Sequence, residues 1–197
     1  GGRRLAGESE SSRQAVAATH GVICTYKGKL FCTYYSAVCG GRTTEGSQIF
    51  TDAVEILKPV TCDGCRDSEY YRWTASITKD DFLKAVQQKG AISRIATIRQ
   101  FESPGSGKIS RFEFSDGKRT AALSGVELRE RFPAGVLRSP HFTLHLEKTT
   151  VRADGRGHGH GVGFCQWGAR GLALAGKKSH EIVHHYYPGA KLEVKKY

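Results

Sequence analysis

The segment Gly155–Gly168, with the sequence GRGHGHGVGFCQWG, contains the residue types and spacing in this chain that are best suited to chemistry. Glycine occupies six of its fourteen positions, and such a density lets backbone N–H groups approach a ligand closely. His158 and His160 lie within this glycine frame, and Gln166 and Trp167 follow it. We call residues 155–168 the glycine loop and expect it to form a binding site.

The residue pattern of the glycine loop is compatible with three kinds of ligand site and with one role that involves no ligand. An anion cradle is disfavoured, because the Lys-Ser/Thr pair of a phosphate-binding loop is missing. A metal site is compatible with the pattern, since alternate histidines can project from one face of an extended segment. A carbohydrate site would use His160 and Gln166 as hydrogen-bonding groups and Trp167 as a stacking surface. The remaining interpretation is a glycine-rich turn whose histidines are merely exposed.

The charge of the chain favours an anionic partner. Its 197 residues include 30 Lys and Arg against 19 Asp and Glu, which gives a net charge of +11. The basic residues are dispersed, without a basic helix or a zinc-finger spacing, so we expect no specific nucleic-acid partner. An anionic membrane surface and the bacterial cell wall remain, as does a generally solvated basic surface.

The apolar content and the first residues bear on location. No stretch approaches the roughly 18 consecutive apolar residues that a membrane-spanning helix needs. No signal peptide opens the chain, and methionine is absent. We therefore expect the chain to be processed or cut from something longer, with any export signal or anchor outside it.

Six cysteines are an unusual number for a cytosolic protein of this size, and they permit an extracytoplasmic location. Cys62 and Cys65 form one C-x-x-C pair, which supplies half of a four-cysteine zinc site at most. No second pair follows at zinc-ribbon spacing, so a disulfide or free thiols are favoured over a metal role there. Cys24 and Cys32 fall on opposite faces of a predicted hairpin, so we expect no disulfide between them.

Apolar periodicity, capping residues and turn residues predict short helices and strands in mixed order. The predicted helices cover residues 8–18, 78–90, a short stretch capped by Ser124 and Glu127, 164–175 and 179–187. The predicted strands cover residues 22–26, 30–35, 70–77, 92–101, 108–114, 119–123 and 142–146. Lys27-Gly28 and Asp116-Gly117 are predicted to form the hairpin turns.

The order of these elements predicts the fold class. Strands and helices do not alternate regularly, which favours α+β over α/β. We expect mixed strands and short helices in one compact unit, with a smaller strand-rich lobe inserted at approximately residues 70–150. Residues 1–197 would then form one domain that is incomplete at its amino terminus.

The glycine loop and several other segments resemble a known family. Gly155–Ala169 is similar to the glycine-arginine-glycine, glycine-histidine-glycine-valine-glycine and glutamine-tryptophan-glycine-alanine sequence of the stage II sporulation protein D family of lytic transglycosylases, which includes the amidase enhancers. Ile182–Gly189 resembles the closing tyrosine-tyrosine-proline-glycine motif of that family. Ala15–Gly21, Tyr26–Gly28 and Tyr35–Thr43 follow the order and spacing of the family, so the resemblance spans nearly the whole chain.

The resemblance implies an extracytoplasmic enzyme that acts on peptidoglycan glycan strands. Such an enzyme cleaves the bond between N-acetylmuramic acid and N-acetylglucosamine without water and leaves a 1,6-anhydro end. One carboxylic acid suffices for this reaction, and no cofactor is required for the cleavage. The alternative that the resemblance offers is a non-catalytic amidase enhancer, which binds the cell wall and acts with other cell-wall hydrolases.

The resemblance also bears on the catalytic acid. The family carries a catalytic glutamate in an amino-terminal helix, and Gln14–Ala18 resembles the end of its motif, which places Glu8 and Glu10 near the required position. Thr25–Gly28, however, matches the segment that the family places after a second helix. We therefore expect the catalytic glutamate upstream of this chain, in an amino-terminal segment or fragment of the same protein. Glu8 and Glu10 would be ordinary first-turn acids favoured by the helix dipole.

The resemblance implies substrate-binding residues in the glycine loop. His160 and Gln166 are expected to contact substrate or to orient the catalytic group, and His158, Trp167 and Gly161 complete the expected set. His158 replaces an aromatic residue that is frequent in the family, but the core of the pattern remains.

Cys39 is the one expected metal ligand. It stands just before Gly40-Gly41, where some relatives place a cysteine that binds zinc together with a further cysteine and a histidine. The resemblance places those two partners in the upstream segment. A structural zinc with Cys39 as a ligand is therefore expected, with a buried free thiol as the alternative.

Overall fold

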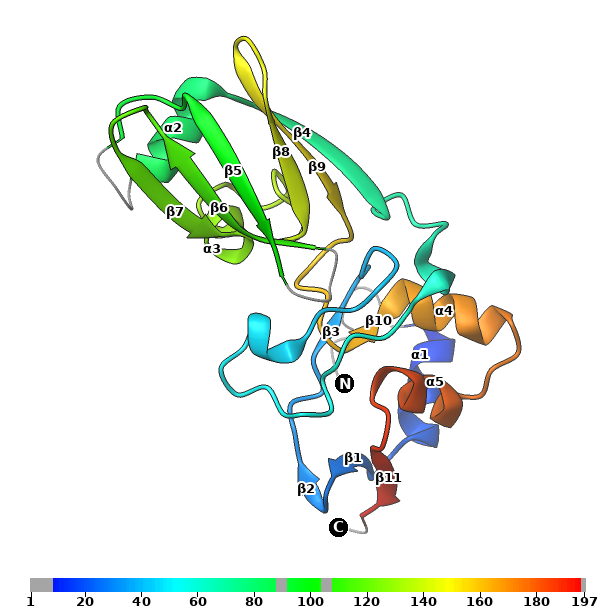
Figure 1. Ribbon diagram of the computed structural model, residues 1–197. Coiled ribbons are helices and arrows are strands. Elements are labelled where there is room, and N and C mark those ends of the chain that lie inside the picture. The colour runs from blue at the N-terminus through cyan, green and yellow to red at the C-terminus, as the bar shows by residue number, and fades with distance from the viewer. Residues whose placement is uncertain (1–8, 88–91, 104–107, 196–197) are drawn as a thin grey trace, which may run out of the picture. The chain divides into compact units, whose positions relative to one another are not determined.

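The computed structural model describes residues 9–87, 92–103 and 108–195, which fold into two compact units. The first unit comprises the described residues up to Phe31 and those from Gly189 onward, and the second comprises Cys32–Pro188. The expected α+β class is confirmed, because helices and strands of several small sheets occur in mixed order (Figure 1). Among the described residues, no helix is both long enough and apolar enough to cross a membrane.

The first unit combines one helix with a small antiparallel sheet of strand order β11-β1-β2. Its elements are α1 (Glu10–Ala18), β1 (Val22–Tyr26), β2 (Lys29–Leu30) and β11 (Lys191–Val194). Lys27 and Gly28 take left-handed conformations with φ of 50° and 76°, and they form the predicted two-residue turn. The second strand of this hairpin ends at Leu30 rather than at residue 35, and Cys24 and Cys32 are free, as expected.

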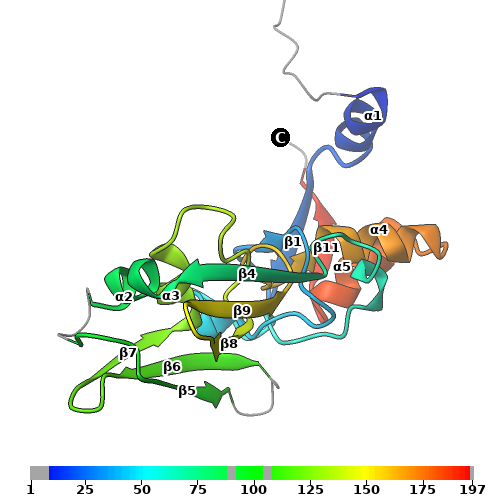
Figure 2. The same cartoon turned by 90° about the horizontal axis from the view of Figure 1, so that it is seen from above.

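The second unit contains two three-stranded antiparallel sheets, whose strands can be followed in Figure 2. The first sheet, of order β4-β9-β8, is built from β4 (Arg72–Thr78), β8 (Phe142–Leu146) and β9 (Thr150–Arg156). The second sheet, of order β5-β6-β7, is built from β5 (Thr97–Glu102), β6 (Ile109–Ser115) and β7 (Thr120–Ser124). The amide group of Gln100 on β5 both donates to the carbonyl of Leu144 and accepts from its N–H, which joins the two sheets.

Helices α2 (Lys79–Gln87) and α3 (Gly125–Glu130) complete the core of this strand-rich part. Fully buried Phe82 and Leu128 from these helices pack with Phe112 and Val151 from the two sheets. The predicted caps are confirmed: Thr78 Oγ1 accepts the N–H of Asp81 at α2, and Ser124 and Glu127 form a capping box at the start of α3. The predicted end of the α2 helix at Gly90 lies outside the described residues.

The remainder of the second unit surrounds the glycine loop. Its elements are β3 (Tyr35–Ser36), the 3-10 turns η1 (Gly46–Gln48) and η2 (Asp63–Cys65), β10 (Phe164–Cys165), α4 (Gln166–Leu174) and α5 (Ser179–Tyr186). Strand β3 pairs in parallel with β10, which brings the two ends of this part together. The helix predicted over 164–175 therefore begins at Gln166, two residues later than predicted, because Phe164 and Cys165 belong to a strand and Cys165 is the N-cap.

Strand β9 has no counterpart among the predicted strands, although it is the central strand of its sheet. Val151, Ala153 and Gly155 alternate inward along it, but a small residue and a glycine give too weak an apolar signal. A Cβ at Gly155 would lie 2.1 Å from the Trp73 ring, so this position has room only for glycine. The assignment of residues 1–197 as one domain with an inserted lobe stays a prediction.

Candidate functional site

The glycine loop is a tightly packed turn rather than an extended segment. Gly157, Gly159, Gly161 and Gly163 all have φ between 67° and 98°, a region that favours glycine. A Cβ at Gly163 would lie 2.2 Å from the carbonyl oxygen of Tyr34. The glycines therefore let separate chain segments approach each other closely.

The backbone donors of the loop are used within the protein. The N–H of His158 donates to the carbonyl of Val38 at 2.7 Å, and that of Gly159 donates to Arg138 at 2.9 Å. The N–H of Gly157 points at the carbonyls of Tyr70 and Tyr71. These donors cannot also cradle an anion, which agrees with the missing phosphate-loop residues.

The two histidines of the loop pack against different aromatic rings. His160 lies edge-on to Phe50 with ring centroids 4.9 Å apart, and its Nδ1 accepts the N–H of Val162 at 3.0 Å. His158 lies edge-on to Tyr70 with centroids 4.8 Å apart. Burial lowers the pKa of both imidazoles, so both are neutral at neutral pH. They contact separate neighbours and do not form a two-histidine metal site.

The other predicted substrate residues lie at the end of the loop and beside it. Gln166 is exposed at the start of α4, and Trp167 is half-buried with the guanidinium of Arg170 over its ring at 5.4 Å. Gly161 is buried, and a Cβ there would lie 3.0 Å from Thr44 Oγ1. Binding roles for these three residues and for the two histidines stay predictions.

A cleft of about 740 Å³ lies beside the loop, where two segments distant in sequence meet. A Cβ at Gly40 would lie 2.7 Å from the Cβ of Arg156, so the segment after β3 touches the start of the loop. The volume falls within the range of about 300–1,000 Å³ typical of ligand sites. The lining includes aromatic and charged side chains: Arg42, Tyr71, Arg72, Trp73, Glu102, Lys108, Phe142, Asp154 and Arg156. None of the five predicted substrate residues lines it.

A chain of buried and partly buried polar groups forms one wall of the cleft. Lys108 Nζ donates to Thr44 Oγ1 at 3.0 Å and to the Arg42 carbonyl at 2.8 Å. Thr44 Oγ1 in turn lies 2.6 Å from His141 Nε2. Burial lowers the pKa of Lys108 to about 8, and burial together with the Lys108 charge lowers the pKa of His141 to about 3. His141 is therefore a neutral hydrogen-bonding group at neutral pH.

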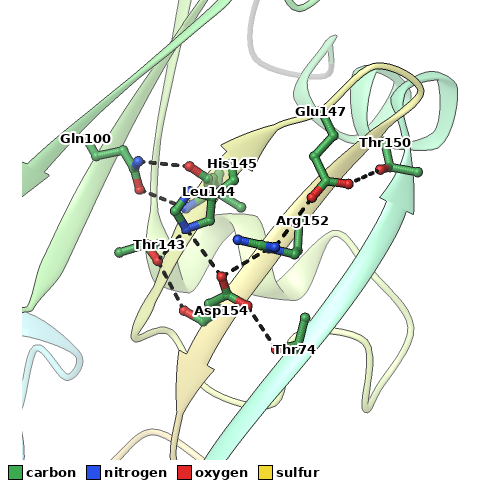
Figure 3. A network of polar contacts seen from close by, with 9 residues as sticks. All are labelled: Thr74, Gln100, Thr143, Leu144, His145, Glu147, Thr150, Arg152 and Asp154. Atoms are coloured by element: carbon green, nitrogen blue, oxygen red, sulfur yellow. Dashed lines mark hydrogen bonds and ion pairs between the residues drawn. The ribbon is translucent and has the colours of Figure 1, made fainter.

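Among the described residues, two carboxylates line the cleft, and neither is arranged as a proton donor. Both oxygens of Asp154 are occupied, one by Thr74 Oγ1 at 2.8 Å and the other by Arg152 at 3.1 Å and His145 at 3.3 Å (Figure 3). Glu102 is exposed at the end of β5. A general acid needs a setting that keeps it protonated, and exposure to water does not provide one.

The two glutamates considered from the sequence lie in the first unit or outside the described residues. Glu10 is exposed in the first turn of α1, where it pairs with Arg13 and accepts from the Gln14 amide at 3.1 Å. Glu8 lies outside the described residues. The surroundings of Glu10 are those of an ordinary helix acid.

Four cysteines meet beneath the cleft, and we call them the cysteine cluster: Cys39, Cys62, Cys65 and Cys165. Their sulfur atoms all lie within 4.8 Å of one another, and each residue is 3% exposed or less. All four are free, which agrees with the free-thiol alternative for the C-x-x-C pair, and the thiols of that pair have neighbours elsewhere in the chain. Hydrogen bonds within the cluster, first with Cys165, lower the pKa of Cys65 and raise that of Cys39.

Several residues of this site carry no sequence signal. Thr44, Lys108 and His141 are isolated in the sequence, and only tertiary packing brings them together. Cys165 also carries no signal as a ligand, because a single cysteine 100 residues beyond Cys65 has no recognisable metal-site spacing.

Comparisons with known proteins place this arrangement in context. A family model described as a domain of unknown function (DUF8618) matches residues 51–163. An uncharacterized protein of Brachyspira hyodysenteriae is 31% identical over 92% of the chain and 48% of its own length. Stage II sporulation protein D of Bacillus amyloliquefaciens is 31% identical over 90% of the chain and 49% of its own length. The amidase enhancer of Bacillus subtilis is 23% identical over 93% of the chain and 33% of its own length. The chain thus spans about half the length of these curated relatives, or less.

Proposed function

The chain belongs to the DUF8618 family and has homologues named stage II sporulation protein D and amidase enhancer, and from this relationship we propose that it acts on the bacterial cell wall. The specific function we propose is that of the glycan-binding part of a peptidoglycan lytic transglycosylase. The single observation that carries the proposal is the cleft, because two of the segments that line it, residues 39–42 and 155–156, fall within stretches that resemble that family.

The lining of the cleft suits a glycan strand with peptide stems. Tyr71, which is partly exposed, offers aromatic surface next to sugar rings, and the polar chain ending at His141 offers hydrogen-bonding groups. Arg72 and Arg156 are exposed at the cleft and can pair with carboxylates of the peptide stem. The net charge of +11 favours approach to such an anionic polymer.

The reaction needs one carboxylic acid, which we place outside this chain. The acid donates its proton to the glycosidic oxygen as the bond to the anomeric carbon breaks. The 6-hydroxyl of the same muramic acid attacks that carbon and returns its proton to the carboxylate, so no water is consumed. The surroundings of Asp154 and Glu102 support an acid supplied by another segment of the protein.

A digest of purified glycan strands tests this assignment. The full-length protein is expected to release 1,6-anhydro-muramyl products, detected by mass, whereas the chain alone should bind strands without cleaving them. Glu102→Gln in the full-length protein should retain product formation, as should the matched surface variant Glu130→Gln. If only the Glu102 variant lost product formation, the catalytic acid would have to be assigned to Glu102 in this cleft. If the full-length protein neither formed products nor bound strands, the proposal would be refuted.

An amidase enhancer is the second candidate, and the absence of a poised proton donor among the described cleft residues favours it. In that function the domain binds the wall and acts with another cell-wall hydrolase. Full-length protein that binds strands, yields no anhydro products and raises the rate of an added amidase would establish it. Arg72→Ala and Arg156→Ala should each weaken strand binding about threefold in either case, because exposed charges contribute less than about 1 kcal/mol. Lys118→Ala, on a distant turn, is the matched control.

A further inference from the structure

The cysteine cluster joins three chain segments that are far apart in sequence. Cys39 follows β3, Cys62 and Cys65 flank the turn η2, and Cys165 ends β10 and caps α4. We propose that these four sulfurs bind one zinc ion in a closed tetrahedral site with a structural role. The inference stands on the cluster itself and is independent of the proposed function.

The spacing of the sulfur atoms fits a metal better than a disulfide. A zinc–sulfur distance of about 2.3 Å in a tetrahedron places the sulfurs about 3.8 Å apart. Cys39 Sγ and Cys65 Sγ are 3.8 Å apart, and all four sulfurs lie within 4.8 Å of one another. A disulfide requires about 2.05 Å between its sulfurs, and no pair in the cluster is bonded.

Further groups are arranged as donors to thiolates. The N–H groups of Cys39 and Gly168 donate to Cys165 Sγ at 3.3 and 3.4 Å. The hydroxyl of Tyr186, which is fully buried, lies 3.2 Å from Cys62 Sγ. Such outer-shell donors orient metal-binding thiolates and stabilise their charge. Neutral thiols accept hydrogen bonds only weakly, so a fully buried tyrosine hydroxyl directed at sulfur is better matched by a thiolate.

The backbone next to the cluster leaves room for the four sulfurs. A Cβ at Gly168 would lie 2.2 Å from both Cys62 Sγ and the Tyr186 hydroxyl. A Cβ at Gly64, inside the C-x-x-C turn, would lie 2.7 Å from the Gly168 carbonyl oxygen. Two glycines thus let the C-x-x-C turn sit against the first turn of α4.

The donor set and its charge point to zinc. Four thiolates with no oxygen or nitrogen ligand suit a soft, tetrahedral ion, and they leave no open position for catalysis. Binding releases the four thiol protons and gives a site of net charge −2. Lys108 interacts electrostatically with Cys39 and Cys65, so its ammonium group offsets part of that charge.

The site has a mechanical consequence for the cleft. Cys39, Gly40 and Gly41 line the cleft, and Cys165 lies within the glycine loop. One ion bound to Cys39 and Cys165 would hold these two segments together and attach both to the C-x-x-C turn. Removal of zinc should therefore loosen the cleft wall before it unfolds the two three-stranded sheets.

Metal analysis of protein purified under reducing, chelator-free conditions tests the proposal. One zinc per chain is expected by elemental analysis. Replacement by cobalt should produce thiolate-to-cobalt charge-transfer absorption and the intense visible bands of a tetrahedral four-sulfur site. Cys62→Ser and Cys165→Ser should lose the zinc and these bands, whereas Cys24→Ser and Cys32→Ser should retain both.

A second measurement uses only the wild-type protein, so it remains informative if the cysteine variants fail to fold. In the wild-type protein, the four cluster cysteines should resist alkylation until a chelator is added, and added zinc should restore the protection. Mass analysis of peptides identifies which cysteines have been alkylated, so the protection is measured without any activity assay. Absence of zinc and of cobalt bands in folded wild-type protein would overturn the proposal, as would disulfides among the four cysteines or the visible absorption of an iron–sulfur cluster.

Discussion

The neutral state of His141 makes the folded protein sensitive to acid in a defined pH window. Its pKa is about 3 in the folded protein, against about 6.5 in an unfolded chain. Below pH 6.5 the unfolded chain therefore binds a proton that the folded protein does not, and stability falls as the pH falls. The stability that the folded protein has with a neutral His141 is fully present above pH 6.5 and is lost progressively as the pH falls to about 3.

The size of this effect follows from the pKa difference. Each pH unit within the window costs about 1.4 kcal/mol, so the wild-type protein should lose about 2 kcal/mol between pH 6.5 and pH 5 from this residue. His141→Gln keeps a hydrogen-bonding group but cannot take up the proton. Between pH 7 and pH 5, the free energy of unfolding of this variant should therefore fall by about 2 kcal/mol less than that of the wild type.

Urea unfolding of both proteins at pH 7, 6 and 5 measures the difference, with His184→Gln, on an exposed position of α5, as the control for loss of one histidine. The imidazole resonances of His141 should show no titration between pH 7 and pH 5. Equal pH dependence in the wild type and in His141→Gln would refute the assignment of His141 as a buried neutral imidazole. So would an imidazole that titrates with a midpoint near 6.5.

Three further predictions concern packing and capping, and each is measured as a free energy of unfolding. Gly157→Ala should cost about 3 kcal/mol or more, because φ is 82° and the new Cβ would lie 2.5 Å from a backbone carbonyl oxygen. Gly176→Ala, with φ of 85° and open space, should cost only about 1 kcal/mol, and equal costs would contradict the close-approach argument. Phe82→Ala should cost about 3–5 kcal/mol because Phe82 is fully buried, whereas Leu174→Ala at a 73% exposed position should change stability by less than about 0.5 kcal/mol. Ser124→Ala removes the cap of α3 and should cost about 1 kcal/mol, and no measurable loss would show that the capping box is dispensable.

Local chemistry made several elements predictable. The Ser124–Glu127 capping box, the Thr78 cap and the Asp116-Gly117 turn all involve partners two or three residues apart. Short sequence separation means that the interaction forms in almost any tertiary context. The strand over Phe142–Leu146 was also located correctly, because alternation between a buried and a solvated face is visible in the sequence.

Strand β9 and the cleft depended on tertiary structure. Residues 150–156 are polar or small apart from Val151, and they form a strand because β4 and β8 pair with them on both sides. Thr44, Lys108 and His141 form a hydrogen-bonded chain although 64 and 97 residues separate Thr44 from its two partners. No local preference encodes contacts at such separations.

The sequence by itself determined which chemistry is available: a glycine-dense loop with two histidines, an excess of basic residues and six cysteines. Only the tertiary structure decided how these groups are used. The loop glycines allow backbone segments to approach each other, so the N–H groups expected to face a ligand bind carbonyls of the protein instead. Four of the six cysteines meet because parallel pairing of β3 with β10 places Cys39 beside Cys165, and packing of α4 against η2 brings Cys62 and Cys65 to them. The sequence specifies the type of each residue directly, whereas the distances between side chains depend on how the whole chain packs.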